Sequence, residues 1–222
     1  MVRTALVCSW ARLRGADQVV EAGVTMPASV AERAIGRQEA PPEAILEFPP
    51  AVARTTCINH FALRWLPTGH PPKGIFTFPH FDLHFYALPP AQIAAIAADA
   101  SALPRPAADH VPPGQLVPAT DEEYLRLLTP QAGCRLTPAA ALEPGYTAGR
   151  EMLYGFWQGS LVFLEVQVAQ AHLLRREDFV LNVLRPAVFG RPTRYPTRLR
   201  ATFDANEGAY HFALTDFVAV ER

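Results

Sequence analysis

Imidazole and carboxylate side chains alternate in the segment HFDLHFY, which spans residues 80–86. Successive side chains of a strand point to opposite faces, so His80, Asp82 and His84 would share one face and the apolar residues between them the other. Histidine and aspartate are ligands of zinc, iron and manganese. The row therefore predicts a divalent-metal site. Two other interpretations stay open: a polar strand face exposed to water, and a metal-free network of His and Asp.

The spacing of this row limits how many of its members can bind one ion. At about 3.3 Å per residue, the Cα atoms of His80 and His84 would lie roughly 13 Å apart, and those of neighbours in the row about 6.6 Å apart. We therefore expect an adjacent pair to bind the ion, or a twisted or bulged strand to bring in all three. A member left out would orient a ligating imidazole through a hydrogen bond.

Two further candidate ligands come from other parts of the chain. His70 lies in PTGHPP, where prolines and Gly69 exclude a regular strand and predict a rigid loop. Glu165 lies in the apolar segment SLVFLEVQVA, where a buried carboxylate needs a partner. That partner could be a metal or a histidine, or an arginine such as Arg64 or Arg150 on a neighbouring strand. The expected ligands are His70, His80, His84 and Glu165, with Asp82 next.

Three more side chains are expected to support these ligands: His60, Tyr86 and Tyr154. A tyrosine near a bound metal could donate a proton. This set predicts a metal-dependent hydrolase or oxygenase whose site lies inside a β-barrel, and the sequence does not separate the two reactions. The alternatives are a non-catalytic oligomer that binds a metal or a small ligand, and a structural module with a metal-free His-Asp network.

Two-residue periodicity dominates the rest of the chain. It predicts a mainly β fold, an antiparallel barrel or sandwich of about eight or nine strands with a few short helices. Strands are expected at 2–13, 18–26, 56–66, 80–86, 151–157, 161–168, 179–184, 197–203 and 209–214, and short helices at 30–36, 89–100 and 120–128. A length of 222 residues with 50% hydrophobic residues favours a single domain over 1–222, with proline-rich connections near 38–55 and 103–120.

Charge and cysteine content restrict the partners and the compartment. With Lys+Arg 20 against Asp+Glu 21, the net charge of -1 offers no general attraction to nucleic acid or to anionic membranes. The three cysteines lie far apart and form no CxxC pair, which is compatible with a reducing compartment. The N-terminal apolar run is too short for a signal-peptide core. We expect a cytoplasmic protein, with export left open.

The segment NHFALRWLPTGHPPKGIFTFPHFDLHFYAL resembles the signature of an uncharacterised bacterial family, a domain of unknown function typified by a Thermus protein under extracytoplasmic sigma-factor control. The family pattern is a strand that begins with His, then WNPxGHxPxG, then PHFDxHFY, then YGxxxGxxxFxE. It is matched at His60, Trp65, Pro67, Gly69, His70, Pro72, Gly74, Pro79, His80, Phe81, Asp82, His84, Phe85, Tyr86, Tyr154, Gly155, Gly159, Phe163 and Glu165. The chain departs from the family at Leu66, Val166 and Gln167. The resemblance extends from about Gly23 onwards and implies a β-rich fold that forms homo-oligomers, without implying an activity.

Overall fold

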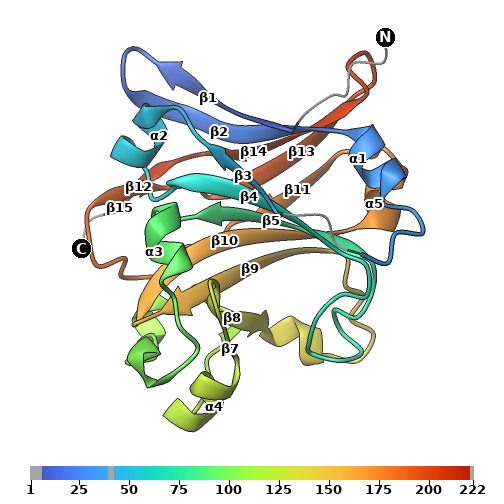
Figure 1. The fold of residues 1–222 in the computed structure, drawn as a ribbon. Coiled ribbons are helices and arrows are strands. Elements are labelled where there is room, and N and C mark those ends of the chain that lie inside the picture. The colour runs from blue at the N-terminus through green and yellow to red at the C-terminus, as the bar shows by residue number, and fades with distance from the viewer. Residues whose placement is uncertain (1–6, 40–42, 221–222) are drawn as a thin grey trace.

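Two antiparallel sheets form the protein, seen in a computed structural model that describes residues 7–39 and 43–220 (Figure 1). The smaller sheet has five strands in the order β1-β2-β14-β13-β11. Their bounds are β1 Cys8–Arg14, β2 Gln18–Pro27, β14 Ala209–Thr215, β13 Arg198–Asp204 and β11 Phe179–Asn182. Residues 2–6 of the first expected strand lie outside the described residues.

The larger sheet has eight strands in the order β3-β4-β5-β10-β9-β8-β6, with β7 paired to β8. Their bounds are β3 Ala44–Glu47, β4 His60–Leu66, β5 His80–Tyr86, β10 Ser160–Ala169, β9 Arg150–Trp157, β8 Gly133–Pro138, β6 Gln115–Leu116 and β7 Leu128–Thr129. A separate pair joins β12 Thr193–Tyr195 to β15 Val218–Val220. The candidate ligand row is therefore β5, a central strand between β4 and β10.

Helices are short and lie at the ends or edges of the sheets (Figure 1). The α-helices are α1 Ala28–Arg33, α2 Pro50–Thr55, α3 Pro90–Ala94, α4 Asp121–Arg126 and α5 Gln170–Leu174, and the 3-10 turns are η1 Ala100–Ala102, η2 Ala108–His110 and η3 Ala139–Leu142. Thr120 caps α4 in a capping box with Glu123, which accounts for this helix. None of the helices in the described part of the chain combines the length and hydropathy that crossing a membrane demands.

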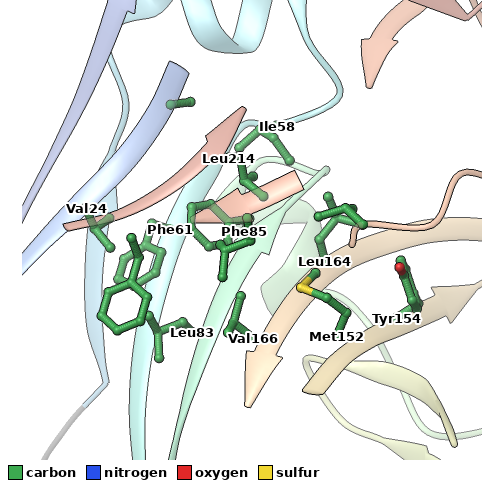
Figure 2. Packing of buried hydrophobic residues seen from close by; sticks show 14 of the residues in the cluster. Val24, Ile58, Phe61, Leu83, Phe85, Met152, Tyr154, Leu164, Val166 and Leu214 are labelled. Carbon is green, nitrogen blue, oxygen red and sulfur yellow. The ribbon is translucent and has the colours of Figure 1, made fainter. Parts of the chain in front are cut away.

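One hydrophobic core draws on both sheets. Figure 2 shows Val24 of β2 and Leu214 of β14 in the same cluster as Phe61, Leu83 and Leu164 of the larger sheet. Because side chains alternate along β5, pointing Leu83 into this core turns the histidines and the aspartate to the opposite face. The ligand row thus lies on the side of the larger sheet that faces away from the core.

That opposite face is buried as well, since every residue of β5 is buried. A second, smaller cluster covers part of it, in which Tyr86 and Phe163 pack against Ile93 and Ile96 at α3. The loop at residues 67–79 brings His70 to the same face, where it contacts Gln167 of β10. Loops and a short helix therefore enclose the polar row. Buried metal-ligating side chains are expected in such a setting.

The expected mainly β architecture is confirmed, and its sandwich form is the one adopted, because neither sheet closes into a barrel along the described strands. The nine expected strands are found as β1, β2, β4, β5, β9, β10, β11, β13 and β14, although β11 covers only residues 179–182 of the expected 179–184. Additional short strands and α2 lie in segments expected to be connections, including 38–55 and 103–120. The helix expected at 30–36 is found as α1, which begins at Ala28 after Pro27 and has no side-chain cap. The single-domain organisation stays a prediction.

Candidate metal centre

Strand register brings the polar residues of three strands together on one face. His84 pairs directly with Glu165 of β10, and Asp82 lies between Arg64 of β4 and Gln167 of β10. Neither pairing of β5 contains a register shift, so the strand carries no bulge that would gather its three polar residues around one point. As the spacing predicted, only adjacent members of the row can share a ligand group.

The polar residues form two groups that share one aspartate. The first, here called the His80 group, contains His70, His80 and Asp82, and the second, the His84 group, contains Asp82, His84 and Glu165. In each group one potential ligand atom per residue lies within 4.8 Å of the others. The structure therefore brings His70 and Glu165 to the row, as expected, but it places them in different groups.

The geometry of His80 fixes which of its nitrogens is free. His80 Nδ1 lies 2.7 Å from the carbonyl oxygen of Phe78, which can only accept, so Nδ1 carries the proton. In the neutral imidazole, Nε2 is then a lone-pair atom, as a metal ligand must be. This hydrogen bond is the kind that orients ligating histidines in metal sites.

His80 Nε2 and Asp82 Oδ1 form the most informative pair of atoms in the site. They lie 3.2 Å apart, both are buried, and neither has a hydrogen-bond partner among the described residues. Two buried atoms carrying lone pairs would repel each other at this distance, so a cation must lie between them: either a proton on Nε2, which makes the two an ion pair, or a metal ion. Ligand atoms of a tetrahedral metal with bonds of about 2.0–2.1 Å lie about 3.3 Å apart. The pair therefore fits one edge of a metal coordination shell.

The loop at residues 67–79 positions His70. The backbone N–H of His70 donates to the carbonyl oxygen of Phe76 at 3.1 Å, and this hydrogen bond closes the loop. Gly69 has φ +71, and a Cβ there would lie 1.9 Å from that same carbonyl oxygen, so the tight closure requires glycine. The ring nitrogens of His70 face carbonyl oxygens of Pro71 and Gln167, the latter at 3.0 Å from Nε2. A ligating His70 would exchange one of these contacts for the metal.

An arginine from β8 occupies the His84 group. Arg135 Nε donates to Glu165 Oε2 at 2.7 Å, and its Nη2 donates to Asp82 Oδ2 at 3.0 Å. His84 Nε2 lies 3.2 Å from the same Glu165 oxygen and 3.4 Å from Arg135 Nη2. The guanidinium thus stands where a metal ion would have to bind these three residues. The expected alternative, an ion pair between Glu165 and an arginine, is found, although the arginine is neither Arg64 nor Arg150.

Burial and neighbouring charges shift the pKa values of the two acids of the His84 group in opposite directions. Burial raises the pKa of Glu165 to about 8, with Asp82 adding to this and Arg135 opposing it. Burial would also raise the pKa of Asp82, but Arg135 and the neighbouring histidines outweigh it and hold the pKa well below its usual range. Burial lowers the pKa of His84 to about 3, so its imidazole is neutral. One guanidinium therefore faces two acids, of which Glu165 gives up its proton less readily.

The three residues expected to support the ligands, His60, Tyr86 and Tyr154, lie in different places. His60 is buried and stacks on Tyr86, with ring centroids 4.7 Å apart, and it belongs to neither group. Tyr86 stacks in turn on His84 at 5.3 Å, and its hydroxyl has no partner among residues 7–39 and 43–220. The expectation for Tyr154 is wrong: it pairs with Leu164 of β10 and lies with the core in Figure 2. Its hydroxyl accepts from the Leu184 N–H at 2.8 Å instead.

Two residues of the site were missed by the sequence reasoning. Arg135 lies in a segment interpreted as irregular, although alternation of Cys134 and Leu136 with Arg135 and Thr137 indicates the strand that β8 forms there. Gln167 shares a face with Glu165, and its side chain links His70 to Glu151, whose Oε2 lies 3.5 Å from Gln167 Nε2. The predicted location inside a barrel is also wrong, because the groups lie on the outer face of an open sheet.

A third group of potential ligands lies at the turn between β13 and β14 and contains Asp204, Glu207 and His211. It is partly exposed, and both ring nitrogens of His211 already have partners, Thr25 at 2.9 Å and Glu207 at 3.3 Å. This group serves as an internal reference for the buried ones.

Comparison with known proteins adds no further residue to the site. No protein-family model, no curated protein and no solved structure matches this chain. The function must therefore be argued from the two groups themselves.

Proposed function

We propose that this chain binds one divalent metal ion at the His80 group and uses it as a metal-dependent hydrolase or oxygenase. The observation that carries the proposal is the buried pair of His80 Nε2 and Asp82 Oδ1, 3.2 Å apart and without hydrogen-bond partners among the described residues. Two histidines and one carboxylate are a ligand set of zinc and of non-haem iron, and manganese is a third candidate.

Three protein ligands leave coordination positions for water or substrate. A metal in such an open site can lower the pKa of a bound water or polarise a substrate oxygen. Gln167 and Glu151 would support His70, since the Gln167 amide contacts both. Arg135 would balance the negative charge of Asp82 on the side turned away from the metal, because it binds Oδ2 while Oδ1 is free.

A structural role for the His84 group is a second proposal, which Arg135 favours. In that group the guanidinium already supplies the cation, so the predicted metal-free network would apply there and not to the His80 group. A non-catalytic metal-binding oligomer would differ from the enzyme by a closed coordination shell. The relationship to the uncharacterised bacterial family, self-association and a cytoplasmic location stay predictions.

Metal content of untagged protein tests the proposal. The chain is reconstituted with zinc, iron or manganese, dialysed and analysed by elemental analysis, beside His80→Ala and the matched variants His84→Ala and His211→Ala. We expect about one ion per chain in the unmodified protein, in His84→Ala and in His211→Ala, and a loss of metal only in His80→Ala. The proposal is wrong if the unmodified protein takes up no metal, or if His80→Ala keeps it.

A further inference from the structure

A cavity of about 660 Å³ adjoins the candidate metal centre through Arg135. Its lining includes Leu116, Val117, Pro118, Leu127 and Leu142, and also Pro72 of the loop that carries His70. The volume falls within the range of about 300–1,000 Å³ typical of small-molecule sites, and a mostly apolar wall with a few polar groups is their usual lining. The cavity therefore has the size and surface of a ligand site.

Arg135 is the charged group that connects this cavity to the buried site. Its side chain is 24% exposed, whereas the acids that it binds are completely buried. Nε and Nη2 are engaged by Glu165 and Asp82, while no partner of Nη1 is found in the described parts of the chain. One end of the guanidinium is thus held by the protein, and the remaining donors are available to a ligand.

The other charged groups of the cavity are already engaged or lie at its rim. Glu123 accepts from the backbone N–H of Ala119 at 2.8 Å in the capping box of α4. Arg126 is largely exposed and lies 3.5 Å from Glu122. Among the lining residues, the charge that is both partly buried and open to a ligand is therefore positive.

The charge of the neighbouring groups decides when an anion can bind. Without a metal, one guanidinium faces the carboxyl groups of Asp82 and Glu165, and a third carboxylate would be repelled when both are ionised. A divalent cation in the His80 group would reverse this balance, because two added positive charges leave the combined site with an excess of one. Metal and anion should therefore bind cooperatively, each strengthening the other.

We propose that this cavity binds a hydrophobic monocarboxylate, with its carboxylate on Arg135 and its apolar chain against Leu116, Val117 and Leu127. Arginine suits this role because its planar guanidinium presents fixed donors to a carboxylate. The dependence on metal rests on the proposed function, whereas the choice of a carboxylate rests on the cavity and Arg135. The ligand class is thus that of short and medium-chain fatty acids and similar apolar acids.

Titration calorimetry with octanoate tests this inference, with octanamide as the neutral analogue of the same length. Zinc content is measured first on the same sample. With one zinc per chain, we expect octanoate to bind at least tenfold more tightly than octanamide. Removing the zinc should lower the affinity for octanoate at least fivefold, which is the lower limit of typical coupling between two sites.

A matched pair of surface variants locates the binding site. Leu142 lines the cavity and is 66% exposed, and Ile35 lies elsewhere with 62% exposed, so neither substitution should prevent folding. Leu142→Glu adds a negative charge to the wall of the cavity and should weaken octanoate binding at least tenfold with zinc content unchanged. Ile35→Glu should leave both unchanged.

The outcomes separate this inference from the proposed function. If zinc binds but octanoate and octanamide bind equally, or neither binds, the carboxylate inference is overturned and the metal site stands. Equal octanoate affinity in Leu142→Glu and Ile35→Glu would also overturn it. If zinc does not bind, the proposed function fails and the metal-dependent carboxylate site fails with it.

Discussion

The His80 group and the His84 group combine similar types of side chain but differ in what neutralises them. Both contain a buried histidine whose Nε2 lies 3.2 Å from a buried carboxylate oxygen, and both include Asp82. In the His84 group Arg135 lies between the acids and binds one oxygen of each, although His84 Nδ1 and Glu165 Oε1 have no partner among the described residues. In the His80 group the two atoms without such a partner, Asp82 Oδ1 and His80 Nε2, face each other and no guanidinium binds them. The presence of one guanidinium is what separates a structural ion-pair cluster from a candidate metal site.

The two groups also differ in how a ligand could reach them. The His84 group lies under Tyr86 and Phe163, and the Phe163 ring meets His84 edge-on with centroids 4.7 Å apart. The His80 group includes His70, which lies on a half-buried loop. A metal or substrate could therefore approach the His80 group without displacing core packing.

The largest expected effect comes from removing the guanidinium. Arg135→Met keeps most of the apolar stem but leaves Glu165 and Asp82 buried without their cation. We expect a loss of about 3–5 kcal/mol in the free energy of unfolding of the metal-free protein, measured with urea. Arg126→Met, at a side chain that is 68% exposed, should stay within about 0.5 kcal/mol of the unmodified protein. A similar small loss for Arg135→Met would contradict its role as the neutralising cation.

Asp82 and Glu165 separate the two groups directly. Asp82→Asn removes a charge that both groups share, so we expect metal affinity to fall at least tenfold and unfolding free energy to fall by about 1–3 kcal/mol. Glu165→Gln should change stability but leave metal affinity within twofold, because Glu165 belongs only to the His84 group. Competition with a chelator measures both affinities. An equal loss of metal affinity in the two variants would mean that the two groups bind metal as a single site.

The loop that carries His70 should affect only the His80 group. Gly69→Ala forces a Cβ against the Phe76 carbonyl oxygen and should lower metal affinity about tenfold, since misplacing a ligand typically costs 10–100-fold. Gly74→Ala is the matched control, because Gly74 has φ +84 in the same loop but nothing within 4 Å of the added Cβ. Equal affinities for the two variants would mean that His70 is not a ligand.

The pH dependence of the metal-free protein tests the protonation of Glu165 and His84. Glu165 has its pKa raised by burial from 4.5 to about 8, so between these values the folded state binds more protons and stability rises as pH falls. Burial lowers the pKa of His84 from 6.5 to about 3, so between these values the unfolded state binds more protons and stability decreases as pH falls.

These two contributions oppose each other between pH 4.5 and 6.5. We therefore expect the combined contribution of these two groups to stability to rise from pH 8 to 6.5, to be nearly flat to 4.5, and to fall below it. Glu165→Gln removes the first contribution, so its stability should already fall below pH 6.5, by about 1.4 kcal/mol per pH unit. Urea unfolding at each pH measures both curves. A plateau that persists in Glu165→Gln would contradict this assignment.

Alternation in the sequence was sufficient to place the ligand row and its neighbours. It predicted the common face of His80, Asp82 and His84, and it predicted the strands at 151–157 and 161–168 that pair as β9 and β10. The spacing argument predicted that either an adjacent pair would bind one ion or a twisted or bulged strand would bring in all three, and the unbroken register of β5 excludes a bulge. Both rest on strand geometry, which is local.

The division into two groups could not be predicted, because it depends on contacts between distant segments. Arg135 reaches Asp82 from 53 residues away, across β9 and β10, and nothing in its own short strand indicates a partner at that distance. Gly155 assists this packing, since a Cβ there would lie 2.2 Å from the Phe163 ring. The outer location of the site also follows from the pairing order of the strands, which local patterns do not determine.

Anomalous diffraction from crystals reconstituted with zinc tests the central claim most directly. We predict one anomalous peak per chain, bonded to His80 Nε2 and Asp82 Oδ1 at about 2.0–2.2 Å, with Arg135 still bridging Asp82 and Glu165. A peak bonded to His84 and Glu165, with the Arg135 guanidinium displaced, would contradict the account.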